Sequence, residues 1–537
     1  MRPTARKLGR TGRAGVVLLT AGIGVLSPFA PTAFAQQPTS SATSWAVPPP
    51  VDPNKLPTDE KKPDKPYKQK TMCVQRSTLG NVDINYRPWG QDYLQLQKAQ
   101  DIVRSAKGSV GGNQKIGVID TGVTPHPWFQ NRVESGGADY VAPPLNGAKP
   151  SLQDCDGHGT EVAGIIAAKP DNPAVGFIGV APDATIVSYR QLSENYEEDT
   201  SSSSTAGGGS SNAPTSGPPS GSSSLPPSNS GGGGQPGGTD PQQDDKGDQR
   251  QLEKGGTAGT LKTLAEIIHN IADRGDIKVV NMSVDHCRPA DGTGGIEDSE
   301  QAVQAAVKYA ADRGVVIVAA AGNVSESCPQ NDQADPNKPR SIVTPPWFAD
   351  DVLSVGAIDR TGGVASFSVH GPWVGVAAPG TEIVSLDPAE GSTGLANLTI
   401  SSGSQTSPIQ GTSFASPYVA GVAALVRQMF PDLDARQVIQ RIKVTAQHPA
   451  APAGRDDYVG YGVIDPVAAL TANLPADVGS LTVPKPMVQP AQLPAGDATS
   501  STPMIVALTG TGGGVLALLI TLFVMHTIRR NRTTTPR

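Results

Sequence analysis

Short apolar runs of strand length alternate along most of this chain with longer segments of helical period. The apolar runs cover residues 115–120, 184–189, 277–284, 315–320, 352–358 and 373–377. The helical segments follow His158 and Ser413 and also cover residues 261–273, 300–313 and 435–445. Strands joined by helices pair in parallel, because each helix returns the chain to the same end of the sheet. The sequence therefore predicts an α/β fold with a mostly parallel sheet and helices on both faces.

Both ends of the chain have the character of membrane-related segments. Residues 1–35 combine basic residues, an apolar run and a small-residue motif, as a cleaved secretory signal peptide does; an uncleaved N-terminal anchor is the alternative. Residues 504–528 lack charged side chains and are long enough for a transmembrane helix, and the arginine-rich residues 529–537 indicate a cytoplasmic tail. We therefore expect an exported protein that one C-terminal helix holds at the cell membrane, with its main domain on the extracytoplasmic side.

Composition divides the region between these two ends. We expect an N-terminal extension over residues 36–106, a main domain over residues 107–473 and a proline-rich stalk over residues 474–503. Residues 193–259 are rich in Ser, Gly and Pro, which predicts a disordered insertion within the main domain. The net charge of −6, without any block of like charge, gives no reason to expect a nucleic-acid partner.

Four polar residues stand at positions where a parallel sheet places its chemistry. Asp120 and Asn323 each come at or just past the carboxyl end of a buried strand. His158 and Ser413 each begin a helix of small apolar residues, where unpaired N–H groups and the helix dipole favour an anion. Considered singly, Asp120 fits a turn residue and Ser413 fits an ordinary helix N-cap. It is the combination that indicates nucleophilic catalysis.

Asp120, His158 and Ser413 follow one another in the order in which subtilisin carries its catalytic triad. Three segments each resemble a signature block of the subtilisin-like serine proteases: residues 120–122 (Asp-Thr-Gly), 158–164 (His-Gly-Thr-Glu-Val-Ala-Gly) and 411–417 (Gly-Thr-Ser-Phe-Ala-Ser-Pro). Residues 320–323 resemble the segment that supplies that family's oxyanion-hole asparagine. The resemblance extends over about residues 100–470, apart from the insertion, and implies a subtilisin-like fold and hydrolysis of peptide bonds.

This resemblance implies a role for each of the four residues. Ser413 would be the nucleophile, His158 its general base and then the general acid, and Asp120 the group that orients the imidazole. Asn323, together with the backbone N–H of Ser413, would stabilise the tetrahedral oxyanion. Residues 281–283 resemble the substrate-pairing strand of the family, although an ordinary core strand fits them equally well.

The predicted signal peptide, extension, stalk and anchor narrow the resemblance to the mycosins, the membrane-anchored subtilases associated with type VII secretion systems. This implies exported protein substrates and a partner in the secretion membrane complex. The leading hypothesis is a serine endopeptidase, and the alternative is a structural component of that complex in which proteolysis is secondary. Asp154, Asp156 and His158 could suggest a metal loop, but the further ligands are missing, so we predict no metal and no cofactor.

The four cysteines fit an oxidising compartment and allow three pairings. Cys155 lies three residues before His158, so it can reach Cys73 only if the extension packs beside the site. Cys287 and Cys328 each follow a strand whose carboxyl end faces the site. We therefore favour Cys73–Cys155 and Cys287–Cys328. The first pair would tie the extension covalently to the catalytic domain, so cleavage alone would not release it as a pro-segment.

Overall fold

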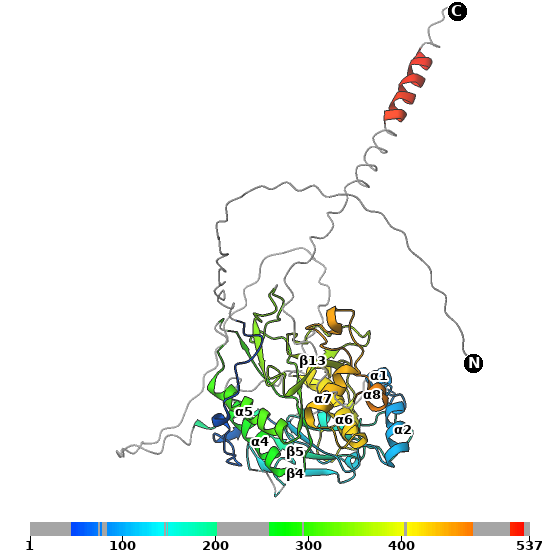
Figure 1. The fold of residues 1–537 in the computed structure, drawn as a ribbon. Coiled ribbons are helices and arrows are strands. Elements are labelled where there is room, and N and C mark those ends of the chain that lie inside the picture. The colour runs from blue at the N-terminus through cyan, green and yellow to red at the C-terminus, as the bar shows by residue number, and fades with distance from the viewer. Residues whose placement is uncertain are drawn as a thin grey trace, which may run out of the picture. The chain divides into compact units, whose positions relative to one another are not determined.

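The structure is a computed structural model of the 537-residue chain, drawn in Figure 1. It describes residues 44–73, 76–77, 83–143, 147, 149–200, 257–290, 292, 295–333, 335–401, 405–475 and 516–530. The predicted signal peptide and most of the predicted insertion and stalk lie outside these residues.

A seven-stranded sheet forms the centre of the main domain, and every neighbouring pair of its strands is parallel. The strands lie in the order β13 (Val374–Pro379), β12 (Val352–Ile358), β10 (Val316–Ala320), β8 (Val279–Met282), β3 (Lys115–Asp120), β5 (Thr185–Arg190) and β4 (Val133–Asp139). The prediction of a mostly parallel sheet is confirmed.

Successive residues of the central strands face opposite sides of this sheet. In β10, Val316 and Val318 belong to one hydrophobic core, whereas Ile317 and Ala319 belong to a second core. The first core also contains side chains of α2 (Leu96–Lys107), α3 (His158–Ala167), α6 (Thr412–Met429), α7 (Ala435–Val444) and α8 (Pro466–Thr471). The second contains side chains of α4 (Leu261–Arg274) and α5 (Asp298–Asp312). Helices therefore cover both faces, as predicted, and burying each such Val or Ile contributes about 1.5–3 kcal/mol.

The segment before β3 contains two helices. The sequence of residues 92–106 is compatible with one helix, but the chain forms α1 (Trp89–Tyr93) and then α2. Gln95, between them, has a left-handed backbone conformation with φ 49°, which an α-helix cannot contain.

The edges of the predicted insertion are strands. Ser193–Glu198 forms β6, which pairs antiparallel with β1 (Tyr67–Gln69) of the extension and with β7 (Thr257–Ala258). A disordered segment that begins at residue 193 is therefore wrong. The polar sequence of β6 has no apolar alternation, and its strand conformation depends on the partner strands on both of its edges. Residues 201–256 lie outside the part of the chain that is described.

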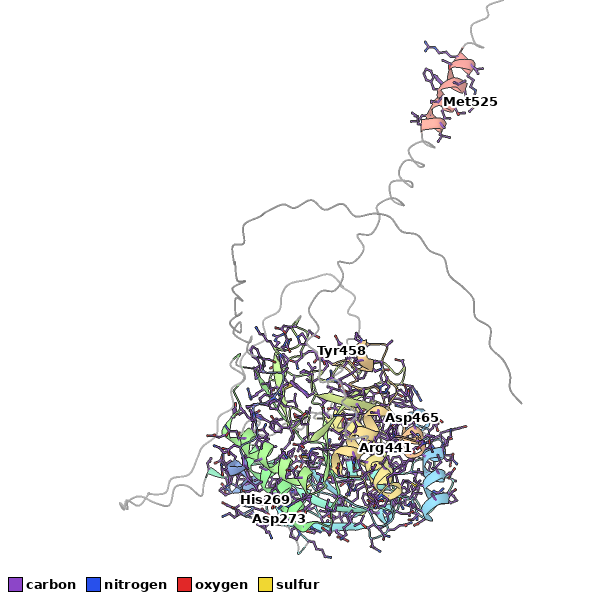
Figure 2. All side chains as sticks on the ribbon, viewed as in Figure 1. His269, Asp273, Arg441, Tyr458, Asp465 and Met525 are labelled. Carbon is purple, nitrogen blue, oxygen red and sulfur yellow. A yellow bond between two sulfur atoms is a disulfide. The ribbon has the colours of Figure 1, made fainter. Side chains whose placement is uncertain are left out.

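The extension packs along the helices of the second core. Trp45 donates its indole N–H to the Pro339 carbonyl at 2.7 Å, and Gln304 of α5 donates to the Pro49 carbonyl at 2.7 Å. His269 of α4, labelled in Figure 2, bonds through Nδ1 to the Pro57 carbonyl at 2.6 Å. These contacts fix a segment whose composition alone favours an extended arm.

Shorter elements complete the domain. Antiparallel pairs join β9 (His286–Pro289) to β11 (Ser341–Thr344), β14 (Ser385–Leu386) to β15 (Leu395–Ala396), and β16 (Leu398–Ser401) to both β17 (Gln405–Pro408) and β2 (Arg76–Ser77). Among the described residues, 3₁₀ helices include η1 (Pro53–Lys55), η2 (Pro127–Phe129) and η5 (Pro452–Gly454).

Residues 516–530, near the C-terminus, form a separate helix that includes Met525 (Figure 2). Within the described part of the chain, no helix combines the length and the apolar character needed to cross a membrane. Residues 504–515 of the predicted transmembrane segment are not among the described residues.

Candidate active site

The sheet and a helix bring Asp120 and His158 into direct contact. Asp120 ends β3 and His158 begins α3, and His158 Nδ1 lies 2.7 Å from Asp120 Oδ1. Both side chains are fully buried. The approach of α3 requires a glycine, because a Cβ at Gly159 would lie 2.0 Å from the Gly122 carbonyl oxygen. The small residues after His158 therefore allow the helix to press against the loop that follows Asp120.

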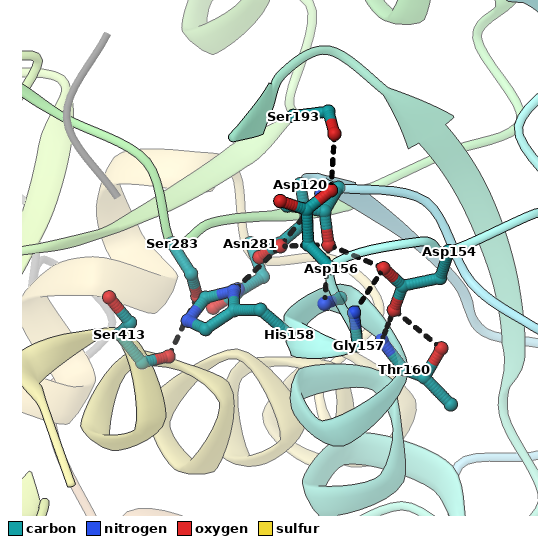
Figure 3. Close-up of polar contacts among 12 residues, drawn as sticks. Asp120, Asp154, Asp156, Gly157, His158, Thr160, Ser193, Asn281, Ser283 and Ser413 are labelled. Carbon is teal, nitrogen blue, oxygen red and sulfur yellow. Dashed lines mark hydrogen bonds and ion pairs between the residues drawn. The ribbon is translucent and has the colours of Figure 1, made fainter. Parts of the chain in front are cut away.

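Ser413 lies in the first turn of α6, and its side chain points toward the His158 ring (Figure 3). It is 2% exposed, and the ring centroid of the next residue, Phe414, lies 4.9 Å from that of His158. Two side chains from the end of β8 hold the serine backbone: Ser283 Oγ donates to the Ser413 carbonyl at 2.8 Å, and Asn281 Nδ2 donates to Ser283 Oγ at 2.8 Å. The nucleophile candidate is thus fixed by the neighbouring strand.

Asn323 joins the same group from the carboxyl end of β10. Its Oδ1 accepts bonds from the backbone N–H and the hydroxyl of Thr412, both at 3.0 Å. Because the amide oxygen is held by the residue before Ser413, the orientation of the amide is set and its NH₂ group is the donor end. The structure therefore brings together all four residues that the sequence singled out.

Asp154 belongs to the site, although the sequence analysis considered it only as part of a possible metal loop and gave it no role. Its Oδ1 accepts from Thr121 Oγ1 at 2.8 Å and from the Gly157 N–H at 2.7 Å. Its Oδ2 accepts from the N–H and the hydroxyl of Thr160 at 2.8 and 2.7 Å. One carboxylate thus ties the loop after Asp120 to the first turn of α3. The only signal in the sequence is an acidic residue shortly before a helix that starts at glycine.

The loop before His158 is also held by β6 and by the extension. Asp156 accepts from the Ser193 hydroxyl and from the Glu194 N–H, and Asn195 Nδ2 donates to the Cys155 carbonyl at 3.0 Å. Cys155 forms a disulfide with Cys73 of the extension. The carboxylates of Asp154 and Asp156 therefore act as hydrogen-bond acceptors within this loop.

The second disulfide joins Cys287 of β9 to Cys328. The two disulfides have the pairing that the sequence analysis favoured.

A buried positive charge lies next to Asp120 in the sheet. Arg190 is the register partner of Asp120 on β5, and its side chain is fully buried. Burial acts to lower the pKa of Arg190, but the Asp139 carboxylate at 3.7 Å and Tyr196 outweigh it and hold the pKa above its ordinary value. The guanidinium also lies 4.7 Å from the ring centroid of Tyr196. A permanent positive charge thus lies on the strand next to Asp120, at the carboxyl end of the sheet.

The chemistry available to this arrangement is acyl transfer. A serine directed at an imidazole, an imidazole paired with a buried carboxylate, and an amide donor beside the serine are the parts of a serine peptidase. On a parallel sheet, and in this chain order, they define a peptidase of the subtilisin type.

Comparisons with known proteins agree with that class. The peptidase S8 family model, described as the subtilase family, matches residues 111–462. Mycosin-1 of Mycobacterium tuberculosis is 38% identical over 471 residues, which cover 84% of this chain and 89% of that protein. The crystal structure of MycP1 from Mycobacterium smegmatis matches with a TM-score of 0.62 at 35% identity, covering 80% of this chain and 96% of that one. A chain in the structure of an intact ESX-5 inner membrane complex matches with a TM-score of 0.63 at 35% identity, covering 90% and 100%.

The chain therefore belongs to the subtilase family and, within it, to the mycosins. It is a subtilisin-like serine endopeptidase.

Proposed function

We propose that this protein hydrolyses peptide bonds of exported proteins through an acyl-enzyme formed on Ser413. The observation that carries the proposal is the 2.7 Å contact between His158 Nδ1 and Asp120 Oδ1, with the Ser413 side chain directed at the same ring (Figure 3). Because Nδ1 is engaged by the carboxylate, Nε2 is the nitrogen left to take the serine proton.

The steps follow from this geometry. His158 accepts the proton of Ser413 Oγ while that oxygen attacks the substrate carbonyl carbon. The oxyanion accepts hydrogen bonds from the Asn323 NH₂ group and the Ser413 N–H. Collapse of the tetrahedral intermediate breaks the C–N bond, and His158 returns its proton to the leaving amine. Water, deprotonated by the same imidazole, then releases the acyl group.

We further propose that the protease domain lies outside the cytoplasm, tethered by a helix over residues 504–528. The two disulfides support an oxidising compartment. Carbonate extraction of membranes should leave the full chain in the pellet and release a variant that ends at residue 503. Release of both proteins would contradict the tether.

The hydrolytic proposal is tested with the full chain, its Ser413→Ala variant and a control, Ser354→Ala. Ser354 is also a fully buried serine, but it lies in β12. With casein as substrate, we expect the Ser413 variant to lose cleavage and the Ser354 variant to retain it. Cleavage by Ser413→Ala at the wild-type rate would overturn the proposed mechanism.

A structural role is the second candidate function. The match to a chain of an ESX-5 inner membrane complex supports it, because that protein occurs within an assembly. In cells that depend on this chain for secretion, Ser413→Ala separates the two roles. Secretion that continues with the variant but stops when the gene is deleted would indicate a structural contribution, and secretion that stops in both would indicate that proteolysis is required.

A further inference from the structure

One buried carboxyl near the site has no part in the mechanism described above. Asp285 lies two residues after Ser283, which bonds to the Ser413 carbonyl. The Asp285 side chain is 4% exposed, and its Oδ1 has no hydrogen-bond partner among the described residues. Burial without a hydrogen-bond partner strongly disfavours the charged form of an acid, so such a group needs an explanation.

Asp285 faces the residue that precedes the oxyanion asparagine. A Cβ placed on Gly322 would lie 3.5 Å from Asp285 Oδ2 and 3.2 Å from Val343 Cγ1. The carboxyl therefore packs against the bare face of Gly322. The next residue is Asn323, whose amide is fixed by Thr412. Asp285 therefore packs against the residue that directly precedes the proposed oxyanion donor.

The ionisable groups on the surrounding elements are engaged elsewhere or do not act on Asp285. Arg288 on β9 donates to Glu300 at 3.1 and 2.8 Å. His370, next to the Val369 N–H that donates to Gly322, bonds to the Asn331 carbonyl. His286 follows Asp285 directly in the chain but does not contribute to the pKa shift of Asp285. Burial alone raises the pKa of Asp285 to about 7, so no neighbouring charge compensates this carboxyl.

We propose that Asp285 is a positioning residue that sets the strength of the Asn323 oxyanion site through its own charge. As a neutral acid it leaves the field at that site unchanged, and as an anion it opposes the negative charge that develops on the substrate oxygen. This inference rests on the proposed function, in which Asn323 is the oxyanion donor.

The physical basis is the sign of the two charges and the medium between them. The intermediate carries its negative charge on one oxygen, and an anion nearby in a buried, weakly screened region raises its energy. Asp285 becomes charged close to neutral pH, so the effect appears within the range in which the protease can be assayed. Acylation is therefore weakened on the alkaline side.

The experiment measures the rate at which a fluorophosphonate labels the full chain and its Asp285→Asn variant between pH 5.5 and 8.5. The ratio of the variant rate to the wild-type rate cancels the contribution of His158, which both proteins share. We expect this ratio to rise about tenfold across the range, with its midpoint near pH 7. A ratio that stays constant would overturn the proposal.

Asp351→Asn is the matched control, because Asp351 is also a buried acid whose pKa burial raises, but it pairs with Arg436. Its rate ratio to wild type should stay constant with pH. If neither wild type nor variant is labelled at any pH, the proposed function itself fails; if wild type is labelled and the ratio is flat, only the role of Asp285 fails.

Thermal unfolding gives a second measurement if Asp285→Asn folds poorly. Because the pKa of Asp285 is raised from 3.8 to about 7 in the folded protein, the unfolded chain releases this proton first. The folded protein therefore loses stability as the pH rises from about 4 to about 7. The melting temperature of Asp285→Asn should therefore improve relative to wild type between pH 4 and pH 7. An unchanged difference would show that Asp285 does not titrate in this range and would overturn the proposal.

Discussion

The two helices that carry the site, α3 and α6, begin differently from α4 and α7, two helices that support the fold. At the start of α4, Thr260 accepts a bond from the N–H of Thr263, and at the start of α7, Asp434 accepts one from Gln437 at 2.8 Å. Helices α3 and α6, in contrast, have Gly157 and Gly411 at their N-cap positions, and neither glycine has a side chain that could cap the helix. Helices α4 and α7 are thus capped by their own N-cap side chains.

The N–H groups at the start of each site helix are instead bound by a residue other than the N-cap. Asp154, in the preceding loop, accepts N–H bonds at the start of α3, and Asn323, 89 residues before Thr412, accepts one at the start of α6. The same contacts that satisfy these helix ends also position the proposed catalytic groups. The starts of α4 and α7 are thus stabilised by the N-cap residue itself, whereas α3 depends on a carboxylate that also binds the loop after Asp120, and α6 depends on a distant residue. Changes at the two kinds of terminus should therefore have different consequences.

Replacement of Asn323, which binds the start of α6, should have the largest effect, and that effect should be on kcat. Asn323→Ala removes the oxyanion donor and the acceptor of the Thr412 bonds, and we expect kcat to fall about 10²–10³-fold, the range known for the equivalent loss in subtilisin. Steady-state kinetics with a peptide substrate measures the change. A fall of less than about fivefold would show that the start of α6 needs no partner from β10.

Loss of the Cys73–Cys155 disulfide should come next, because it ties the loop before α3 to the extension. The loop it closes spans 82 residues, so Cys73→Ser with Cys155→Ser should lower the free energy of unfolding by about 2–4 kcal/mol. The Cys287–Cys328 pair, with a separation of 41, should cost about 0.6 kcal/mol less by loop entropy. Denaturant unfolding of both double variants tests this order, and the reverse order would contradict it.

Asp154→Ala against Asp434→Ala compares the two kinds of helix start directly. The first change leaves several buried donors without an acceptor, so we expect a loss of about 1–3 kcal/mol together with a clear fall in kcat. The second removes an ordinary N-cap and should cost about 1 kcal/mol with kcat unchanged. Melting curves and kinetics on both variants are needed. Equal kcat values would remove the proposed link between the start of α3 and the chemistry.

The smallest effect is expected at Asp276, just after the end of α4. The hydrogen bond from Arg274, with Lys115 nearby, lowers the pKa of Asp276 to about 2 from its ordinary 3.8. The stabilisation is present at neutral pH and is lost as pH falls from about 4 to 2. Because the pair is partly exposed, Asp276→Asn should cost only about 0.2–1 kcal/mol at pH 7. A cost that persists at pH 2 would exclude this explanation.

The sheet and the four central residues could be predicted from the sequence for the same reason, which is that both have a clear local sequence pattern. Buried strands such as β3 are continuous apolar runs, and Asp120 and Asn323 interrupt such runs at the edge where parallel strands meet. The helices that begin at His158 and Ser413 follow recognisable small-residue patterns.

Features that depend on distant partners could not be predicted. Strand β6 is polar and forms only because β1 and β7 pair with it. The role of Asp154 depends on three loop and helix positions meeting in space, and the burial of Asp285 depends on the packing of Gly322 against it. None of these has a periodic or motif-like signal in the local sequence.

The proposed mechanism requires Ser413 to be the nucleophile of an assembled site. Labelling of the full chain with a fluorophosphonate, with the modified residue mapped by mass spectrometry, tests this assignment alongside His158→Ala. We predict a phosphonylated Ser413 in the wild type and strongly reduced labelling in the variant, because the serine then lacks its base. Labelling at another residue, or equal labelling of Ser413 in the variant, would contradict the account.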